Sequence, residues 1–188
     1  AIEGQTSMLS SQFGFHYRPE LLKNPDFSEG LEHWSVSGEI ETSSDTLFGK
    51  QGMGIWASGK RMSFAVFKGT ETVKEPALQQ TVSGLIPGKA YSLQFVTADL
   101  KDILENRINP RPLPISADLG SPELLPGRSF VHIDRRTKTS KTSHARINLH
   151  RIVFRAATPV LPITIRSAGK ADEKLILAHI QLKPYFEN

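Results

Sequence analysis

Hydrophobic and polar residues alternate with a period of two along most of the chain, and clusters of Gly, Pro, Asn and Ser separate the alternating runs. In the run Ala90 to Asp99, for example, Tyr91, Leu93 and Phe95 fall on one side and the residues between them on the other. This period is typical of β-strands joined by turns. The pattern therefore predicts an all-β fold.

Nine runs have the length and alternation of strands, namely 39–42, 54–57, 62–68, 77–82, 90–99, 128–134, 145–156, 159–166 and 173–184. Strands this short, with turn signals between them, favour a two-sheet antiparallel β-sandwich whose facing surfaces form the core. In 145–156 the apolar phase slips at His150 and Arg151, which predicts a β-bulge there. In 173–184 the alternation sets Ile176 and Ile180 opposite Leu175 and Leu177.

The longest segment without strand alternation is 100–127, which begins with a helical turn around KDILENR and continues as a Pro-rich loop. A loop of this length is uncommon in a compact domain. We expect it to lie across one sheet or one end of the sandwich. The chain then divides into an N-terminal tail at 1–20 and one β-sandwich domain at 21–188, with 100–127 as an insertion loop.

Composition supports a single globular domain. The chain has 188 residues, of which 38% are hydrophobic and 22% charged, and this is enough for one sizeable core. It has no cysteine, which excludes a disulfide framework and thiolate metal sites. No apolar run approaches the length of a membrane span. Because the first residue is Ala and no leader is visible, we expect the chain to be cut from a longer polypeptide.

The net charge of +4 comes mostly from one region. Between Arg128 and Arg155 there are eight basic residues against Asp134 alone. Such clustering marks either a solvated basic edge or a surface for an anionic polymer. The polymer alternative would use Arg135, Arg136, Lys138, Lys141, Arg146 and Arg151. No helix-turn-helix or zinc-finger motif accompanies the cluster, so nucleic acid is the less favoured polymer.

Three segments in sequence order resemble the carbohydrate-binding-module-like jelly rolls of the galactose-binding-like group. The first strand segment of those domains is similar to NPDFSEGLEHWSVSG, in which the matching residues are Asn24, Asp26, Phe27, Gly30, Leu31 and Trp34. The other two are the hairpin at 78–99, with its LIPGKAY turn, and the last three strands at 150–184. Phe27 and Trp34 are expected in the core, with Gly30 allowing the chain to fold back between them.

The resemblance implies a non-catalytic module that binds a polysaccharide or oligosaccharide. Such modules are appended to extracytoplasmic carbohydrate-active enzymes or surface proteins, so it also implies a secreted, bacterial protein next to a catalytic domain such as a glycoside hydrolase. The alternative is a structural or interaction domain that packs on a neighbouring domain or partner and binds no sugar.

Many members of that group carry a structural calcium, held by a carboxylate after the first Phe and an Asp of the last strand. Here these places hold Ser28 and, near the end, Ala178 and His179. Calcium needs six to eight oxygen ligands. We therefore expect no metal and no cofactor, and a bound calcium would have to use Asp26 and Glu29.

Sugar binding calls for exposed aromatic faces flanked by amide and guanidinium groups, because a pyranose has an apolar face edged by hydroxyls. The candidates are Trp56, Arg61, Tyr17, His16, Gln94, His150 and Arg151. The last three lie on predicted strands, where they would project from an outer or concave face.

The sequence contains no clear arrangement of catalytic residues. His132 and Asp134 share one strand face but lack a third ligand at a diagnostic spacing. The carboxylates Asp102, Glu105, Asp118 and Glu123 lie in or beside the long loop, with nothing to set their separation. No catalytic residue is therefore predicted.

Overall fold

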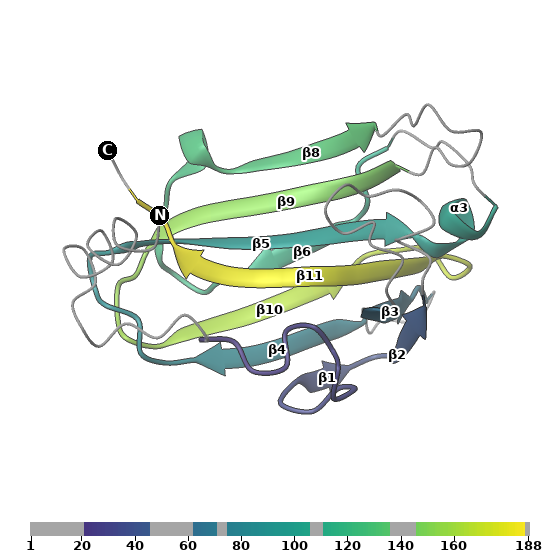
Figure 1. Cartoon of the computed structure of the whole chain (residues 1–188), viewed down its shortest axis with the longest axis horizontal. Coiled ribbons are helices and arrows are strands. Elements are labelled where there is room, and N and C mark those ends of the chain that lie inside the picture. Colours follow the sequence, from purple (N-terminus) through teal and green to yellow (C-terminus); the bar gives the residue numbers. More distant parts are fainter. Residues whose placement is uncertain (1–20, 46–61, 71–74, 106–110, 136–145, 187–188) are drawn as a thin grey trace.

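Two antiparallel β-sheets pack face to face and form a sandwich in this computed structural model, which describes residues 21–45, 62–70, 75–105, 111–135 and 146–186 (Figure 1). The predicted all-β sandwich is thus confirmed. None of the helices in these ranges is long and apolar enough to cross a membrane.

The sheets differ in width. The four-stranded sheet has the order β1 (Ser35–Ser37), β4 (Ala77–Val82), β10 (Leu161–Ser167) and β6 (Ile115–Asp118). The seven-stranded sheet has the order β2 (Ile40–Asp45), β3 (Met62–Lys68), β11 (Lys174–Pro184), β5 (Ala90–Asp99), β9 (Arg146–Arg155) and β7 (Glu123–Leu124), and β8 (Phe130–Arg135) also pairs with β9.

One hydrophobic core fills the space between the sheets. β5 contributes Tyr91, Leu93 and Phe95 from the wide sheet, and β10 contributes Ile163 and Ile165 from the narrow one. These are the alternating sets that the sequence pattern places on one side of each strand. Burial of apolar area on this scale is the main stabilising contribution to such a sandwich.

The segment 24–34 closes the core as the sequence motif predicts. Phe27 and Trp34 are buried with their ring centroids 5.8 Å apart, and Gly30 has a φ of 64° at the point where the chain folds back. The Nε1 of Trp34 donates a hydrogen bond to the carbonyl of Asn24 at 2.9 Å. The Asn24 side chain bonds the backbone of Gly30, Glu32 and Glu29 and so holds the loop together.

The predicted bulge at His150–Arg151 was wrong. β9 pairs with β5 without any register shift, from Arg155 opposite Ala90 to Asn148 opposite Thr97. The apparent phase slip has another cause, because Leu149 faces away from the core and His150 faces into it.

The register shift lies in β11, between Ala178 and Gln181, where His179 has a φ of 53°. Before the shift Leu175 and Leu177 face the core, and after it Ile180 and Leu182 do. The extra residue of the bulge moves the second half of the strand into the opposite phase.

The segment 100–127 contains regular structure and is not a simple insertion loop. It begins with the helix α3 (Leu100–Leu104) and then supplies β6 and β7, one to each sheet, before the 3-10 helix η2 (Pro126–Arg128). Arg111 anchors it through ion pairs with Asp99 and Glu173.

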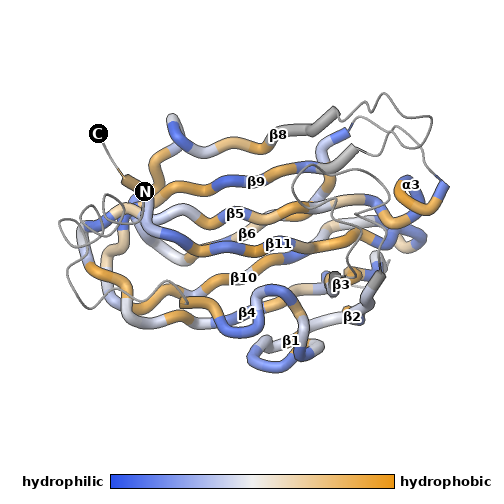
Figure 2. Tube along the Cα trace, viewed as in Figure 1, coloured by the Kyte–Doolittle hydropathy of each residue, from blue (hydrophilic) through white to orange (hydrophobic). Residues whose placement is uncertain are grey.

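A second, smaller apolar cluster lies on the outer face of the wide sheet. It joins Ile103 of α3 to side chains of three strands, including Phe64, Val96 and Ile176, all buried. Figure 2 shows hydrophobic segments of the strands near α3 and hydrophilic segments farther along β9 and β11. The outer face is therefore apolar beside α3 and polar beyond it.

Candidate functional site

A row of side chains crosses the polar part of the wide sheet. Gln181 of β11 is directly opposite Gln94 of β5, Gln94 is opposite Arg151 of β9, and Arg151 is opposite Phe130 of β8. We call these four residues the cross-strand row. Three strand spacings of about 4.8 Å make the row roughly 14 Å long.

Strand alternation makes the row point away from the core. Gln94 lies between Leu93 and Phe95, which are both core residues. Gln181 lies in the same way between the core residues Ile180 and Leu182. Since neighbouring residues of a strand face opposite sides of the sheet, both amides belong to the outer face.

Aromatic rings and guanidinium groups meet at the β8 end of the row. The Arg151 guanidinium carbon lies 4.7 Å from the centroid of the Phe130 ring and 5.6 Å from that of Tyr185. Arg128 lies over the same Tyr185 ring, also at 5.6 Å. The Arg151 Nε donates to the Arg128 carbonyl at 2.9 Å, which fixes the direction of the guanidinium.

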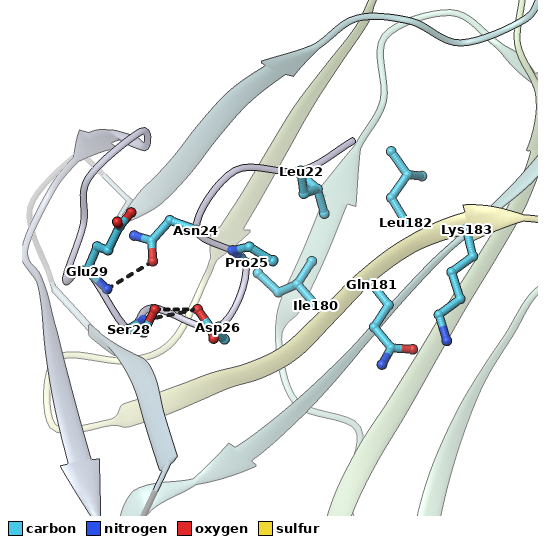
Figure 3. Close-up of a pocket in the computed structure, with 10 residues that line it drawn as sticks. All are labelled: Leu22, Asn24, Pro25, Asp26, Ser28, Glu29, Ile180, Gln181, Leu182 and Lys183. Carbon is cyan, nitrogen blue, oxygen red and sulfur yellow. Dashed lines mark hydrogen bonds between the residues drawn. The ribbon is translucent and has the colours of Figure 1, made fainter. Parts of the chain in front are cut away.

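A groove adjoins the other end of the row. β3 pairs with β11 only over Lys174–Leu177, so the loop 22–29 runs beside the second half of β11 instead. Between them lies a groove of about 500 Å³, whose lining includes Asp26, Ser28, Gln181 and Lys183. In Figure 3, Gln181 and Lys183 extend from the same side of β11. A second hollow of about 340 Å³ continues the groove to Ser63 and His179.

Gln94 and Arg151, both predicted as ligand contacts, are therefore brought together as cross-strand neighbours. His150 is placed differently from the prediction, because it is 4% exposed and faces the core. Its Nε2 lies 2.8 Å from the Thr97 hydroxyl, and its ring stacks on Phe95 at 4.4 Å between centroids. Burial lowers the pKa of His150 from 6.5 to about 4. The ring is thus a neutral core residue at physiological pH.

Several predicted contacts lie outside the described residues. These are Trp56, Arg61, Tyr17 and His16, and also Arg136, Lys138 and Lys141 of the basic region. Their roles remain predictions. Arg135 and Arg146 are register partners on β8 and β9, which brings these two positions of the basic region next to each other.

The carboxylates near the long loop are distributed over different elements. Asp102 lies in α3, Asp118 in β6 of the narrow sheet, and Glu123 in β7. Asp118 accepts a hydrogen bond from the Gly120 backbone at 2.8 Å, and Glu123 pairs with Arg155 at 3.8 Å. The first contact belongs to a turn, and the second is a cross-strand pair at a sheet edge.

The loop 24–34 fits a calcium ion poorly. The Nδ2 atom of Asn24 donates to the carbonyls of Gly30 and Glu32, so an amide hydrogen occupies oxygens that a cation would need. The Asp26 Oδ1 accepts from the backbone and hydroxyl of Ser28. Within the described ranges no three His, Cys, Asp or Glu residues are grouped to hold a metal.

Sequence reasoning missed four residues of this surface, namely Phe130, Gln181, Lys183 and Tyr185. Gln181 and Lys183 alternate with Ile180 and Leu182, so the local pattern does place them on one face. Which face that is depends on the bulge in β11. Phe130 and Tyr185 were not predicted as surface residues, because an aromatic residue in or beside a strand is usually part of the core.

The row has the chemistry of a receptor for a polyhydroxylated molecule. Each glutamine amide offers donors and an acceptor, and the guanidinium offers further donors. The rings of Phe130 and Tyr185 offer apolar faces, although Arg151 already stacks against both. The groove beside β11 adds the carboxylate of Asp26 and the ammonium of Lys183.

The two-sheet sandwich is also the fold of solved carbohydrate-binding modules, so the resemblance drawn from the sequence is confirmed for the fold. The chain is similar to TmCBM61, solved in complex with β-1,4-galactotriose, with a TM-score of 0.50 and 17% identity over 90% of this chain and all of that one. It is also similar to the enzymatically active domain of tailspike protein 4 of bacteriophage CBA120, with a TM-score of 0.52 and 10% identity. That match covers 89% of this chain and 22% of the tailspike chain. No family model and no curated protein matches the sequence.

Proposed function

We propose that this domain is a non-catalytic module that binds an oligosaccharide along the cross-strand row. The observation that carries the proposal is the register, which aligns two amides and a guanidinium across three adjacent strands. Side chains held by a sheet are preorganised, so binding orders few of them. A row of roughly 14 Å suits a short chain of sugar rings better than a single ring.

The ends of the row support an extended ligand. The groove beside β11 continues the row at Gln181, and the rings of Phe130 and Tyr185 flank its other end. The fold shared with TmCBM61 supports β-1,4-galactotriose as a first probe. As part of this proposal, the module acts extracytoplasmically, in a bacterial protein, beside a catalytic domain or on a surface protein.

The test is a glycan array followed by titration calorimetry, with β-1,4-galactotriose among the probes. Gln94→Ala and Gln181→Ala should each weaken binding about fivefold to tenfold, the value of one or two hydrogen bonds. The matched control is Gln79→Ala, because Gln79 is exposed on β4 of the narrow sheet. Equal losses in all three variants, or no glycan bound by the parent, would contradict the proposal.

A second function, packing on a neighbouring domain, has support at one sheet edge. Leu124 is 55% exposed and Val131 58% exposed. Leu124 also lines an apolar hollow of about 350 Å³ together with Leu119 and Ile152. Apolar surface of this kind often marks a contact site. Absence of glycan binding in the array would favour this function.

A further inference from the structure

The β8 end of the cross-strand row carries a concentration of positive charge. Arg128 and Arg151 both lie against the Tyr185 ring, and the Arg151 Nε reaches the backbone of Arg128. Lys183, exposed on β11, lies on the same outer face but at the other end of the row, beside the groove.

Among the described residues, the Arg151 guanidinium has no carboxylate partner. The ion pair of Arg155 with Glu123, at 3.8 Å, involves neither Arg151 nor Lys183. In the part of the chain that the structure describes, no carboxylate forms an ion pair with either of these two cations. An anionic group of a ligand could therefore pair with the Arg151 guanidinium.

The Arg151 side chain is also held in position for an anion. Its Nε donates a hydrogen bond to the Arg128 carbonyl at 2.9 Å, and the rings of Phe130 and Tyr185 lie against the guanidinium carbon. These contacts restrain the planar group and leave its terminal nitrogens as donors. A planar guanidinium recognises a carboxylate through two parallel hydrogen bonds.

We infer that the oligosaccharide is acidic, and that Arg151, which lies beside Arg128, binds the carboxylate of a uronic acid residue. This inference rests on the proposed function and adds the class of sugar to it. The amides of Gln94 and Gln181 then bind hydroxyls of the adjoining rings. The affinity should contain an electrostatic contribution that salt weakens.

The test compares two trisaccharides that differ only at C6, α-1,4-linked galacturonic acid and α-1,4-linked galactose, by titration calorimetry at low and high salt. The parent should bind the acidic sugar about tenfold to a hundredfold more tightly at low salt. High salt should reduce that preference. Arg151→Gln should abolish the preference, because the acidic sugar loses its charged partner. The neutral sugar should lose only the few-fold affinity of one contact of the row.

Arg166→Gln is the matched control, because Arg166 is exposed on β10 of the narrow sheet and carries the same charge. It should bind both sugars as the parent does. Arg151→Lys guards against a folding defect, since it retains the charge and should retain part of the preference. Thermal unfolding of each variant confirms that it is folded.

Equal, salt-independent binding of the two trisaccharides would overturn the acidic-sugar inference and leave the proposed function standing. Binding of neither, with no glycan bound on the array, would overturn both. A single-stranded DNA oligonucleotide that competes as well as the uronate, with the same loss in Arg151→Gln, would overturn the sugar assignment and identify a general polyanion site.

Discussion

His150 is a base kept neutral by its position between the sheets. Its ring stacks on Phe95, and its Nε2 lies 2.8 Å from the Thr97 hydroxyl, which can donate to an unprotonated nitrogen. Burial opposes the charged form and lowers the pKa of His150 from 6.5 to about 4. The folded protein therefore binds this proton less readily than the unfolded chain.

This difference predicts a loss of stability in mild acid. Between pH 6.5 and pH 4 the unfolded state takes up the His150 proton and the folded state does not, so the free energy of unfolding falls with pH. Between pH 6.5 and 5 the loss from this group is about 1.5 kcal/mol. Urea unfolding of the parent and of His150→Gln over this range should show a shallower pH dependence in the variant.

The other groups with a lowered pKa should not produce a difference in pH dependence between the parent and His150→Gln. The pKa of Glu173 is lowered from 4.5, despite the opposing effect of burial, by the Lys170 backbone and by Arg111. Its stabilisation is consequently lost only below pH 4.5. Burial also lowers the pKa of His179, but that residue is present in both proteins. Identical slopes for parent and variant would contradict the assignment to His150.

Single residues of the binding face show what sequence patterns reveal at this scale. Gln94 and Arg151 were predicted to project from a sheet face because each is a polar residue of a predicted strand, and the structure places them opposite each other. His150 interrupts the same run as Arg151 but faces the core. A polar residue in a strand is therefore an ambiguous signal, since its side depends on the phase of the whole strand.

At the scale of elements, the backbone directly after β3 packs against the backbone of the loop before β11. A Cβ atom on Gly69 would lie 1.7 Å from the carbonyl oxygen of Lys170, and the Gly69 backbone donates to the Glu173 carbonyl at 2.8 Å. The segment after β3 and the segment before β11 thus approach so closely that no side chain fits between them.

Gly69→Ala should destabilise the protein by about 2 kcal/mol or more, because the backbone of one segment must move. Gly127→Ala is the control, since a Cβ there would meet nothing within 4 Å. Urea unfolding of the two variants provides the measurement. Similar midpoints for both would show that the junction can relax and that the contact is unimportant.

The elements themselves were largely predictable. The strands 62–68, 77–82 and 90–99 were expected with the bounds that the structure has. The bulge was expected in β9 and occurs in β11, because both strands show a change of apolar phase and only pairing with neighbours distinguishes them. The strands β6 and β7 were missed, since two to four residues in a Pro-rich segment carry no recognisable period.

At the scale of the whole molecule, a single core joins both sheets and the loop 24–34 to one another. The loop is held by hydrogen bonds of Asn24 and by the buried rings of Phe27 and Trp34. Direct contacts of the chain thus provide the stabilisation that a structural cation could otherwise supply.

We predict that removal of divalent cations leaves the melting temperature unchanged. Differential scanning calorimetry before and after dialysis against EDTA, and again after addition of calcium chloride, provides the measurement. A melting temperature that falls with EDTA and recovers with calcium would show that Asp26, Glu29 or residues elsewhere in the chain hold the ion. It would then contradict our expectation of no metal and indicate a structural calcium like that of many members of the resembled group.

The sequence by itself determined the strands, the all-β class and the residues of the loop 24–34 that close the core. These features depend on local alternation and on short motifs such as Asn24 to Trp34. Only the tertiary structure decided which residues form one surface. Gln181, Gln94, Arg151 and Phe130 are far apart in the chain, and they align because strand pairing and one bulge set their register. Register is a property of paired strands, and no single strand's sequence contains it.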